Sequence, residues 1–427
     1  VKNRISIPFF TGPKLRERPV YLLILLRFLV DFPLKRLFLI PLTRFMKQVY
    51  LDNAATTPLR EEVIASMHEA LCGCYGNPSS THAFGRMART GIEKARKSIA
   101  AQLNAQPGEI IFTSGGTEAD NMILRCAVRD QGVTTLITSK IEHHAVLHTA
   151  EALAEEYDIT LKYLPLDADG NPDLAELERA LQEDDSRKLV SLMHVNNEIG
   201  NLLDLEAVGS LCREYGALFH SDTVQSVGHF PWDLSRTPID FLTAAAHKFH
   251  GPKGVGFAYV RKNSGLRPLI LGGSQERGFR AGTEPYHNIV GLHKAFETAY
   301  AHLDEEREYV AGLKSHFIEE LKKAIPEIQF NGLSGDMERS TYTLVNVRLP
   351  VDPAKSQLLL FHLDLNGIAC SKGSACQSGS DSGSHVLNEI LDAEALSLPS
   401  LRFSFSHYNT LEEVDYAVGV LEEFANS

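Results

Sequence analysis

Between residues 85 and 260, amphipathic helical patterns alternate with short apolar runs rich in β-branched residues. Helical patterns cover RMARTGIEKARKSIAAQL, EADNMILRCAVRD and AVLHTAEALAEEY, and strand patterns cover EIIFTS, TTLITS and ITLKYLPL. The same alternation continues to the run GVGFAYV. Because the strand runs are apolar throughout, they indicate strands that are buried on both faces. The sequence therefore predicts an α/β fold with a mostly parallel sheet covered by helices.

A second, smaller α/β region follows a long helical pattern near 303–325. It contains the strand patterns YTLVNVRL and LRFSFS, the helical pattern AKSQLLLFHLDLNG, and a closing helix that begins with a Thr410…Glu413 capping box. A chain of 427 residues is longer than most single domains. We predict an N-terminal extension (1–45), an arm that packs with the smaller domain (46–60), a large domain (61–303) and a small C-terminal α/β domain (304–427).

The first 45 residues differ in charge from the rest of the chain. They hold nine Lys/Arg against Glu17 and Asp31, a net charge of +7, and since the whole chain carries −12 the remainder carries −19. Their apolar stretch is interrupted by charges such as Arg27, so it falls short of the roughly 20 residues of a membrane-spanning helix. Either Met46 is the native start, or the segment is a basic amphipathic anchor at a membrane surface. We favour the first, and expect no membrane partner and, for so acidic a body, no direct nucleic-acid partner.

The cysteines argue against a disulfide framework and against a zinc site. Six of them stand at positions 72, 74, 126, 212, 370 and 376, without the density or the paired spacing that either would need. This predicts a reducing, cytoplasmic setting and no required metal. Cys370 ends the apolar run GIAC and is expected to be a small buried hydrophobe. Cys376 lies in the run GSACQSGSDSGSH, whose Ser and Gly residues can neither pack a core nor hold a regular element.

Three polar groups follow strand patterns of the large domain. In FTSGGTEADN, Gly115, Gly116 and Thr117 stand where a strand ends and a helix begins, so they form either a plain turn or a phosphate site made of backbone N–H groups and a hydroxyl. The Walker lysine and the GxGxxG spacing of nucleotide sites are missing. On this evidence alone the turn and the phosphate site both stay open.

The other two groups are Asp222, in HSDTVQSVG, and Lys248, in HKFHGPKG. Asp222 ends a buried strand, so it is either a helix N-cap or the partner of a buried positive charge, such as a protonated ring nitrogen. Lys248 is either a surface residue or a desolvated amine able to form a Schiff base. A phosphate cradle, a carboxylate for a pyridine nitrogen and such a lysine, on successive strand ends, are what pyridoxal 5′-phosphate (PLP) requires.

With these motifs in place, the sequence resembles the NifS/IscS-type (group I) cysteine desulfurases of the class V PLP-dependent aminotransferases. The resemblance runs from about Val49 to the C-terminus through YLDNAATTP, GNPSSTH, FTSGGTEADN, TSKIEHHAVL, MHVNNEIG, HSDTVQSVG, HKFHGPKG, ERGFRAGTEP, GSACQSGS and LRFSFS. It implies PLP fold type I, PLP as the cofactor and a homodimer. It also implies conversion of L-cysteine to L-alanine, with the sulfur passing to an enzyme cysteine as a persulfide.

The resemblance assigns roles to individual residues. Lys248 would form the Schiff base and take the substrate Cα proton, and Asp222 would pair with the pyridine nitrogen. His143 would stack on the ring and carry protons. The remaining cofactor contacts would come from Gly116, Thr117 and His247 at the phosphate, from Asn197 and Gln225 at the ring hydroxyl side, and from Thr283 at the phosphate of the neighbouring subunit.

On the substrate side, the resemblance makes Arg402, with Asn197, the site for the cysteine carboxylate and Cys376 the nucleophile that attacks the substrate sulfur. The strand pattern alone would turn Arg402 outward, because it alternates with Leu401 and Phe403. The persulfide would pass to an acceptor such as an iron–sulfur scaffold or a thiolation protein. Cys376 could hold an iron–sulfur cluster only transiently.

Other functions stay open. A selenocysteine lyase or another class V aminotransferase would share the PLP residues, and a non-catalytic scaffold of sulfur metabolism would share the fold. Two departures from the family pattern stand out in this chain. Ala245 replaces a serine that contacts the cofactor phosphate, and SDSGSH after Cys376 replaces a segment that often holds an acidic residue and a proline. We expect the alanine to weaken PLP retention, and the docking partner of that segment stays undefined.

Overall fold

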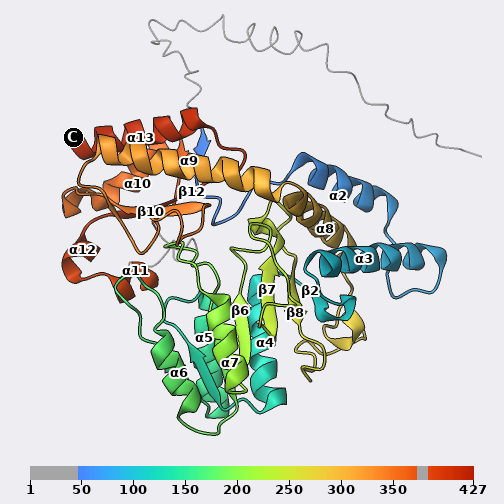
Figure 1. The fold of residues 1–427 in the computed structure, drawn as a ribbon. Coiled ribbons are helices and arrows are strands. Elements are labelled where there is room, and N and C mark those ends of the chain that lie inside the picture. Colours follow the sequence, from blue (N-terminus) through green and yellow to red (C-terminus); the bar gives the residue numbers. More distant parts are fainter. Residues whose placement is uncertain (1–46, 373–382) are drawn as a thin grey trace, which may run out of the picture. The chain divides into compact units, whose positions relative to one another are not determined.

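The computed structural model describes residues 47–372 and 383–427, and its larger part is built on one seven-stranded sheet (Figure 1). In spatial order the strands are β2 (Ile110–Thr113), β8 (Gly256–Val260), β7 (Phe241–Ala245), β6 (Leu218–Asp222), β5 (Lys188–Ser191), β3 (Thr135–Thr138) and β4 (Thr160–Tyr163). From β7 to β4 every neighbouring pair is parallel, whereas β8 pairs antiparallel with both β2 and β7. This is the mostly parallel sheet that the sequence predicted.

Helices cover both faces of this sheet, and each face has its own apolar core. Alternate residues of one strand enter different cores: Leu136 of β3 packs on one face and Ile137 on the other. The first core contains residues of α4 (Gly116–Gln131) and α5 (His144–Tyr157). The second contains residues of α3 (Ala83–Gln102), α6 (Leu174–Gln182), α7 (Leu205–Glu214) and α8 (Tyr286–Ala301), and α2 (Glu61–Gly73) packs on α8.

In the C-terminal part of the chain, helices pack on a small antiparallel sheet. The strand order is β12 (Ser400–Ser404), β10 (Leu344–Arg348) and β9 (Gln329–Phe330). One face of this sheet packs on α9 (Leu303–Ala324) and α13 (Leu411–Asn426), with Phe317 and Phe403 in ring contact. The other helices of this part are α10 (Ser356–Leu365), α11 (His385–Ile390) and α12 (Ala393–Ser397). Thr410 and Glu413 form the predicted capping box of α13.

The segment after residue 46 joins the small sheet although it is far from it in sequence. Its strand β1 (Val49–Tyr50) pairs in parallel with β11 (Ile368–Ala369). Val49 and Leu51 are buried in the core of the small sheet. The predicted arm was 46–60, and from here on we use the word arm for residues 49–56 of it. The next residue, Thr57, reaches the edge of the large sheet, where its N–H donates to the His247 carbonyl at 3.0 Å.

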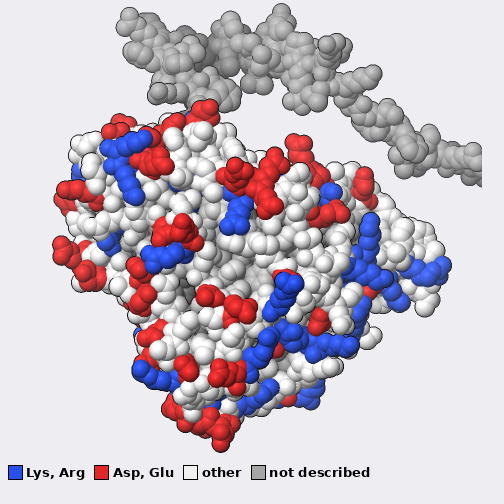
Figure 2. Space-filling model, in the orientation of Figure 1, with Lys and Arg blue, Asp and Glu red and all other residues white. Residues whose placement is uncertain are grey.

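The predicted N-terminal extension and the predicted division into domains stay predictions. The predicted extension, residues 1–45, lies outside the described residues. The boundary at residue 303 coincides with the start of α9, and we keep the division into domains as a proposal. Within the described ranges, no helix is long and apolar enough to cross a bilayer. On the surface, the face shown in Figure 2 carries both Lys/Arg and Asp/Glu side chains.

Candidate active site

The polar groups predicted from the sequence lie at one edge of the large sheet. Asp222 is the last residue of β6, and Lys248 ends a short 3₁₀ turn that follows β7. Helix α4 begins at Gly116, three residues after the end of β2. Since β2, β6 and β7 run in the same direction, their carboxyl ends meet at this edge, where ligands bind in open α/β sheets.

A cavity of about 210 Å³ lies at this edge. With the exception of Thr283, every predicted site residue in the described ranges lines it: Gly116, Thr117, His143, Asn197, Asp222, Gln225, His247, Lys248 and Arg402. Ala245 lines it too, beside Gly116. The structure therefore brings together residues that are up to 286 positions apart in the sequence, from Gly116 to Arg402.

The start of α4 fits a bound phosphate. Gly115 has a φ of +154°, a conformation that side chains rarely adopt, and as N-cap it offers no side chain to the first N–H groups of the helix. A Cβ on Gly116 would stand 2.8 Å from the Val224 Cγ2 atom. Glycine therefore leaves the backbone N–H groups open to an anion, and the positive end of the helix dipole favours one there.

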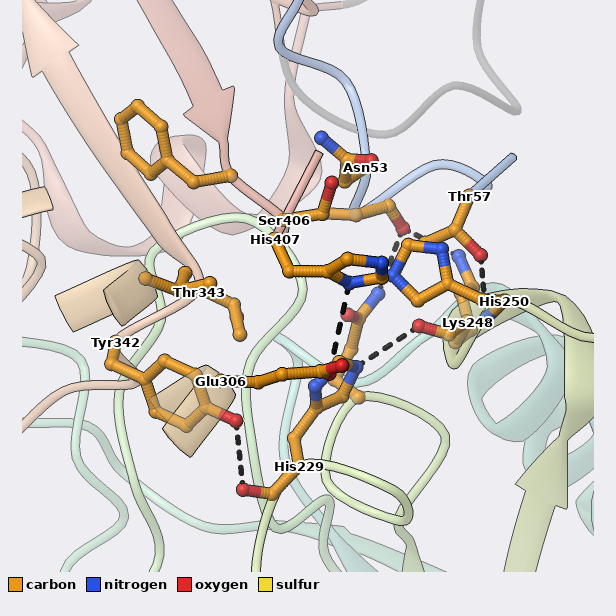
Figure 3. A pocket seen from close by; sticks show the side chains of 14 residues that line it. Asn53, Thr57, His229, Lys248, His250, Glu306, Tyr342, Thr343, Ser406 and His407 are labelled. Atoms are coloured by element: carbon orange, nitrogen blue, oxygen red, sulfur yellow. Dashed lines mark hydrogen bonds and ion pairs between the residues drawn. The ribbon is translucent and has the colours of Figure 1, made fainter. Parts of the chain in front are cut away.

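Lys248 is held by the arm. Its Nζ atom donates hydrogen bonds to the carbonyl oxygens of Ala54 (2.5 Å) and Ala55 (2.9 Å). Lys248 also lines a second, much smaller cavity (Figure 3). There the His229 Nε2 atom donates to the Lys248 carbonyl at 2.9 Å, and the Tyr342 hydroxyl donates to the His229 carbonyl at 2.9 Å. These bonds hold the backbone of Lys248 in place, and its side chain lines the larger cavity.

Asp222 is a buried acid whose charged form would be stabilised by a positive charge in contact with it. Its Oδ1 atom accepts a hydrogen bond from the Val224 N–H at 2.9 Å, which closes a turn and does not cap a helix. Burial, and next the charge of Asp120, raise the pKa of Asp222 to about 7. Burial also raises the pKa of Asp120 to about 7. A protonated ring nitrogen facing Asp222 would lower that pKa again, because an opposite charge favours the carboxylate.

The two histidines of the cavity are neutral at physiological pH. Burial, and then the charge of Lys248, lower the pKa of His143 to about 4 and that of His247 to about 4. His143 is the N-cap of α5, and its Nδ1 atom accepts from the Ala145 N–H at 3.1 Å. The proton of the neutral ring is therefore on Nε2. This arrangement fits an aromatic contact with a ring in the cavity, and it leaves one N–H group available.

Arg402 does not point outward, so the expectation from strand alternation alone was wrong. Leu401 and Phe403 do enter the core of the small sheet, but the opposite face of β12 lies against the arm and the segment after β5 instead of solvent. The Arg402 side chain is 1% exposed. Its Nη1 atom donates to the Asn197 carbonyl at 2.7 Å, and its Nη2 atom donates to Asp52 Oδ1 at 3.0 Å. Arg402 thus lies at the cavity that Lys248 and Asp222 also line.

Two further residues named from the sequence do not line this cavity, and a third is outside the described residues. Thr283 lines a separate hollow of about 250 Å³ with Ser114 and Arg280. Cys370 packs against the core of the small sheet, and burial raises the pKa of its thiol well above the usual range. Cys376 lies outside the described residues, as do the first three residues of the SDSGSH segment (380–382).

Known proteins resemble this chain over most of its length. Residues 49–417 match the model of the family described as aminotransferase class-V. The chain belongs to this family. Its curated relatives include "Cysteine desulfurase IscS" of Dictyoglomus turgidum, 44% identical over 88% of this chain and 94% of the relative, and "Putative cysteine desulfurase IscS 1" of Bacillus subtilis, 43% identical over 87% and 97%. The class V chain is thus of the cysteine desulfurase type.

Solved structures agree with the class V assignment. A structure titled "NifS-like protein" has a TM-score of 0.80 and 36% identity, covering 89% of this chain and all of its own. Another, titled "SspA in complex with cysteine", has a TM-score of 0.73 and 34% identity, covering 85% of this chain and all of its own. The predicted family and the predicted PLP fold type I are both confirmed.

Sequence reasoning missed several cavity groups of this class V chain. Asp52 binds Arg402, the carbonyls of Ala54 and Ala55 bind Lys248, and Asp120 lines the cavity. The motif YLDNAATTP was part of the resemblance, but no role was attached to its residues. Backbone carbonyls leave no signal in a sequence. Asp52, the one acid of this motif, could have been named as a candidate, although the sequence does not indicate its partner.

Proposed function

We propose that this class V enzyme converts L-cysteine to L-alanine and passes the sulfur to Cys376 as a persulfide for delivery to an acceptor protein. The single observation that carries the proposal is the shared cavity of Lys248, Asp222 and Arg402 beside the start of α4. It offers an amine, an acid for a ring nitrogen, a guanidinium for a carboxylate and an anion cradle. The relative titled as a complex with cysteine supports cysteine as the substrate.

PLP is the cofactor that these residues fit. Gly116, Thr117 and His247 would hold the phosphate, Asp222 the ring nitrogen, and Gln225 the side of the ring hydroxyl. When bound, PLP supplies an electron sink for the pair of electrons left on Cα once its proton is removed. The raised pKa of Asp222 supports this assignment, since a buried carboxylate is stabilised by a cation in contact with it.

Substrate binding and proton transfer would use two residues that the arm already holds. Arg402 would bind the substrate carboxylate with its planar fork of N–H groups. Lys248 would take the Cα proton, because its amine is directed into the cavity by bonds to Ala54 and Ala55. Asn197, whose carbonyl binds Arg402, also lines the cavity on the substrate side.

The sulfur would leave through Cys376. Its thiolate attacks the substrate sulfur, an S–S bond forms as the Cβ–S bond breaks, and Cβ gains a proton on the way to alanine. His143, neutral with a proton on Nε2, would carry protons in this step. The persulfide on Cys376 could then be transferred to a thiol of an acceptor protein, and an iron–sulfur scaffold or a thiolation protein would serve as acceptor.

The assembly would be a homodimer in the cytoplasm. Large apolar side chains are exposed at the end of α2 and the start of α3, and they would be covered by a second copy: Leu71, Tyr75, Phe84 and Met87. Thr283 does not line the cavity of its own chain. This also supports a dimer in which Thr283 of the second subunit reaches that cavity. The five cysteines of the described ranges are unpaired, which supports a reducing setting.

The decisive experiment measures alanine formation from L-cysteine by the PLP-loaded protein and its variant Cys376→Ser. We expect turnover in the parent, and loss of alanine formation in the variant with the cofactor absorbance retained. A selenocysteine lyase would turn over selenocysteine but not cysteine. An aminotransferase would pass the amino group to a keto acid, and a scaffold would bind no cofactor. Unimpaired turnover by Cys376→Ser would reject Cys376 as the nucleophile.

A further inference from the structure

Asp52 of the arm is in direct contact with the arginine at the substrate end of the cavity. Its Oδ1 atom accepts from Arg402 Nη2 at 3.0 Å and from the Ser371 hydroxyl at 2.8 Å. Ser371 is also bound through its backbone to Arg402, with N–O distances of 3.2 and 2.7 Å in the two directions. Asp52, Ser371 and Arg402 therefore form one closed set of hydrogen bonds between the arm and the small sheet.

The guanidinium of Arg402 is held from two sides. Nη2 is bound by Asp52 and Nη1 by the Asn197 carbonyl, while Nε has no hydrogen-bond partner within the described residues. A guanidinium has five N–H groups, and two of them are engaged by these contacts. Each Nη atom thus keeps a second N–H for a carboxylate in the cavity that Arg402 lines. Because both Nη atoms are anchored, the plane of the fork is fixed before a substrate arrives.

Asp52 is also the ion-pair partner of Arg402 in the described structure. The Arg402 side chain is 1% exposed and that of Asp52 is 19% exposed, so the acid remains partly hydrated while it compensates a cation that is fully buried. A buried charge without such a partner is strongly unfavourable. Removing Asp52 would therefore let the long Arg402 side chain turn toward other acceptors or toward water.

We propose that Asp52 is a positioning residue for the substrate carboxylate: it fixes the Arg402 guanidinium in the orientation that receives it. The inference rests on the proposed function, because it takes Arg402 as the carboxylate site. It predicts that Asp52 contributes to the binding of amino acids that carry an α-carboxylate. Asp52 would contribute nothing to the binding of amines that lack this group, nor to the proton transfer at Lys248.

The test compares Asp52→Ala and Asp52→Asn with the parent holoenzyme. We expect Asp52→Ala to raise the KM for L-cysteine at least tenfold, with kcat within twofold and the cofactor absorbance unchanged. Asp52→Asn keeps an acceptor oxygen but loses the charge, so its KM should lie between the two. This second variant keeps the test valid if the alanine variant fails to fold. The matched control is Asp336→Asn, which breaks an Asp–Arg pair with Arg339 on the surface and should change neither constant.

Two binding measurements separate positioning from a general effect on the fold. Binding of cysteamine, which is cysteine without its carboxylate, is followed through the cofactor absorbance and should be equal in parent and variants. In an Arg402→Ala background, Asp52→Ala should cause no further loss of L-cysteine binding, since the two residues act as one unit.

Each outcome decides the matter. An unchanged KM, or a lower one as expected if Asp52 merely competes with the substrate, overturns the inference. So does an equal loss of cysteamine binding, or an undiminished effect of Asp52→Ala without Arg402. Failure of the proposed function would look different, because the parent itself would then release no alanine from cysteine.

Discussion

Arg280 binds the carboxylate of Glu118 through two hydrogen bonds, from Nε to Oε1 at 2.8 Å and from Nη2 to Oε2 at 3.1 Å. Glu118 is in the first turn of α4, and its Oε2 atom also accepts from the Ser114 N–H at 2.8 Å. Arg280 is three residues before Thr283. The segment that carries Thr283 is thus fastened beside the phosphate cradle of its own chain, while Thr283 itself faces a different hollow.

This attachment leads to a prediction about subunits. A Lys248→Ala chain lacks the amine and a Thr283→Val chain lacks the hydroxyl, but a mixed dimer would hold one site with both groups if Thr283 acts across the interface. We expect mixing of the two variants to restore about one functional site per mixed dimer, measured as cofactor retention and alanine formation. The control mixes the Lys248→Ala/Thr283→Val double variant with parent chain, whose mixed dimer should lack any intact site. No recovery in the first mixture would mean that Thr283 acts in its own chain or not at all.

Ala245 leads to a prediction about cofactor retention. It lines the cavity beside Gly116, where a Cβ on the glycine would be 3.9 Å from the Ala245 Cβ atom. In Ala245→Ser the hydroxyl should reach the phosphate and add one hydrogen bond to a charged group, worth about 1.5–3 kcal/mol. We expect PLP loss on dialysis to slow about tenfold or more, followed by the absorbance of the retained cofactor.

The opposite change supplies the control for that experiment. Thr117→Val removes a hydroxyl from the cradle with little change in shape, so it should accelerate the loss of PLP. An unchanged rate in Ala245→Ser, with an accelerated rate in Thr117→Val, would show that position 245 does not contact the phosphate.

The sequence predicted the large sheet well, because its strands are buried on both faces and therefore form separate apolar runs between helices. Asp222, Lys248 and Gly116 line one cavity, as the sequence led us to expect, since residues that follow parallel strands meet at one edge of a sheet. Arg402 shows the limit of that reasoning. Alternation tells which side of β12 the arginine is on, but not that another part of the chain covers this side.

A buried ion pair should stabilise the fold near the segment that carries Thr283. Arg96 binds both carboxylate oxygens of Glu276 at 2.8 Å, and each side chain is 2% exposed. Arg96→Met would leave the acid buried without its partner, so we expect a loss of about 3–5 kcal/mol in the free energy of unfolding. Urea titration of the holoenzyme measures it. Arg179→Met breaks the exposed pair with Glu176 and should cost less than about 1 kcal/mol. Equal losses would show that burial is not the cause.

Glu142 should make stability depend on pH. Burial raises its pKa to about 8, from an ordinary value near 4.5. Between these values the folded chain keeps a proton that the unfolded chain releases, so this group lowers stability as pH rises, by at most about 1.4 kcal/mol per pH unit. Glu142→Gln can keep the acceptor for the Met193 N–H and lacks the titration. Its free energy of unfolding relative to the parent should therefore increase from pH 5 to pH 8, measured by urea titration. A difference that is constant with pH would contradict a raised pKa.

The contacts of the arm could not have been predicted from local patterns. The bonds from Lys248 to Ala54 and Ala55 use main-chain oxygens, which every residue has. Asp52 and Arg402 are 350 positions apart, and a single sequence does not indicate which distant acid compensates a buried arginine. Long-range polar pairing is decided by the assembled fold, and so it becomes visible only with the structure.

The arm also sets an order of events during protein synthesis. Residues 49–56 emerge from the ribosome early, but their partners emerge late: β11 ends at Ala369 and Arg402 lies in β12. The large sheet can form before then, because its last strand ends at Val260. Lys248 and the phosphate cradle would thus exist in the growing chain before the arm has β11 to pair with and before the substrate end of the cavity exists. A complete cavity therefore requires that Arg402 has left the ribosome, so capture of the first cysteine has to wait for that point.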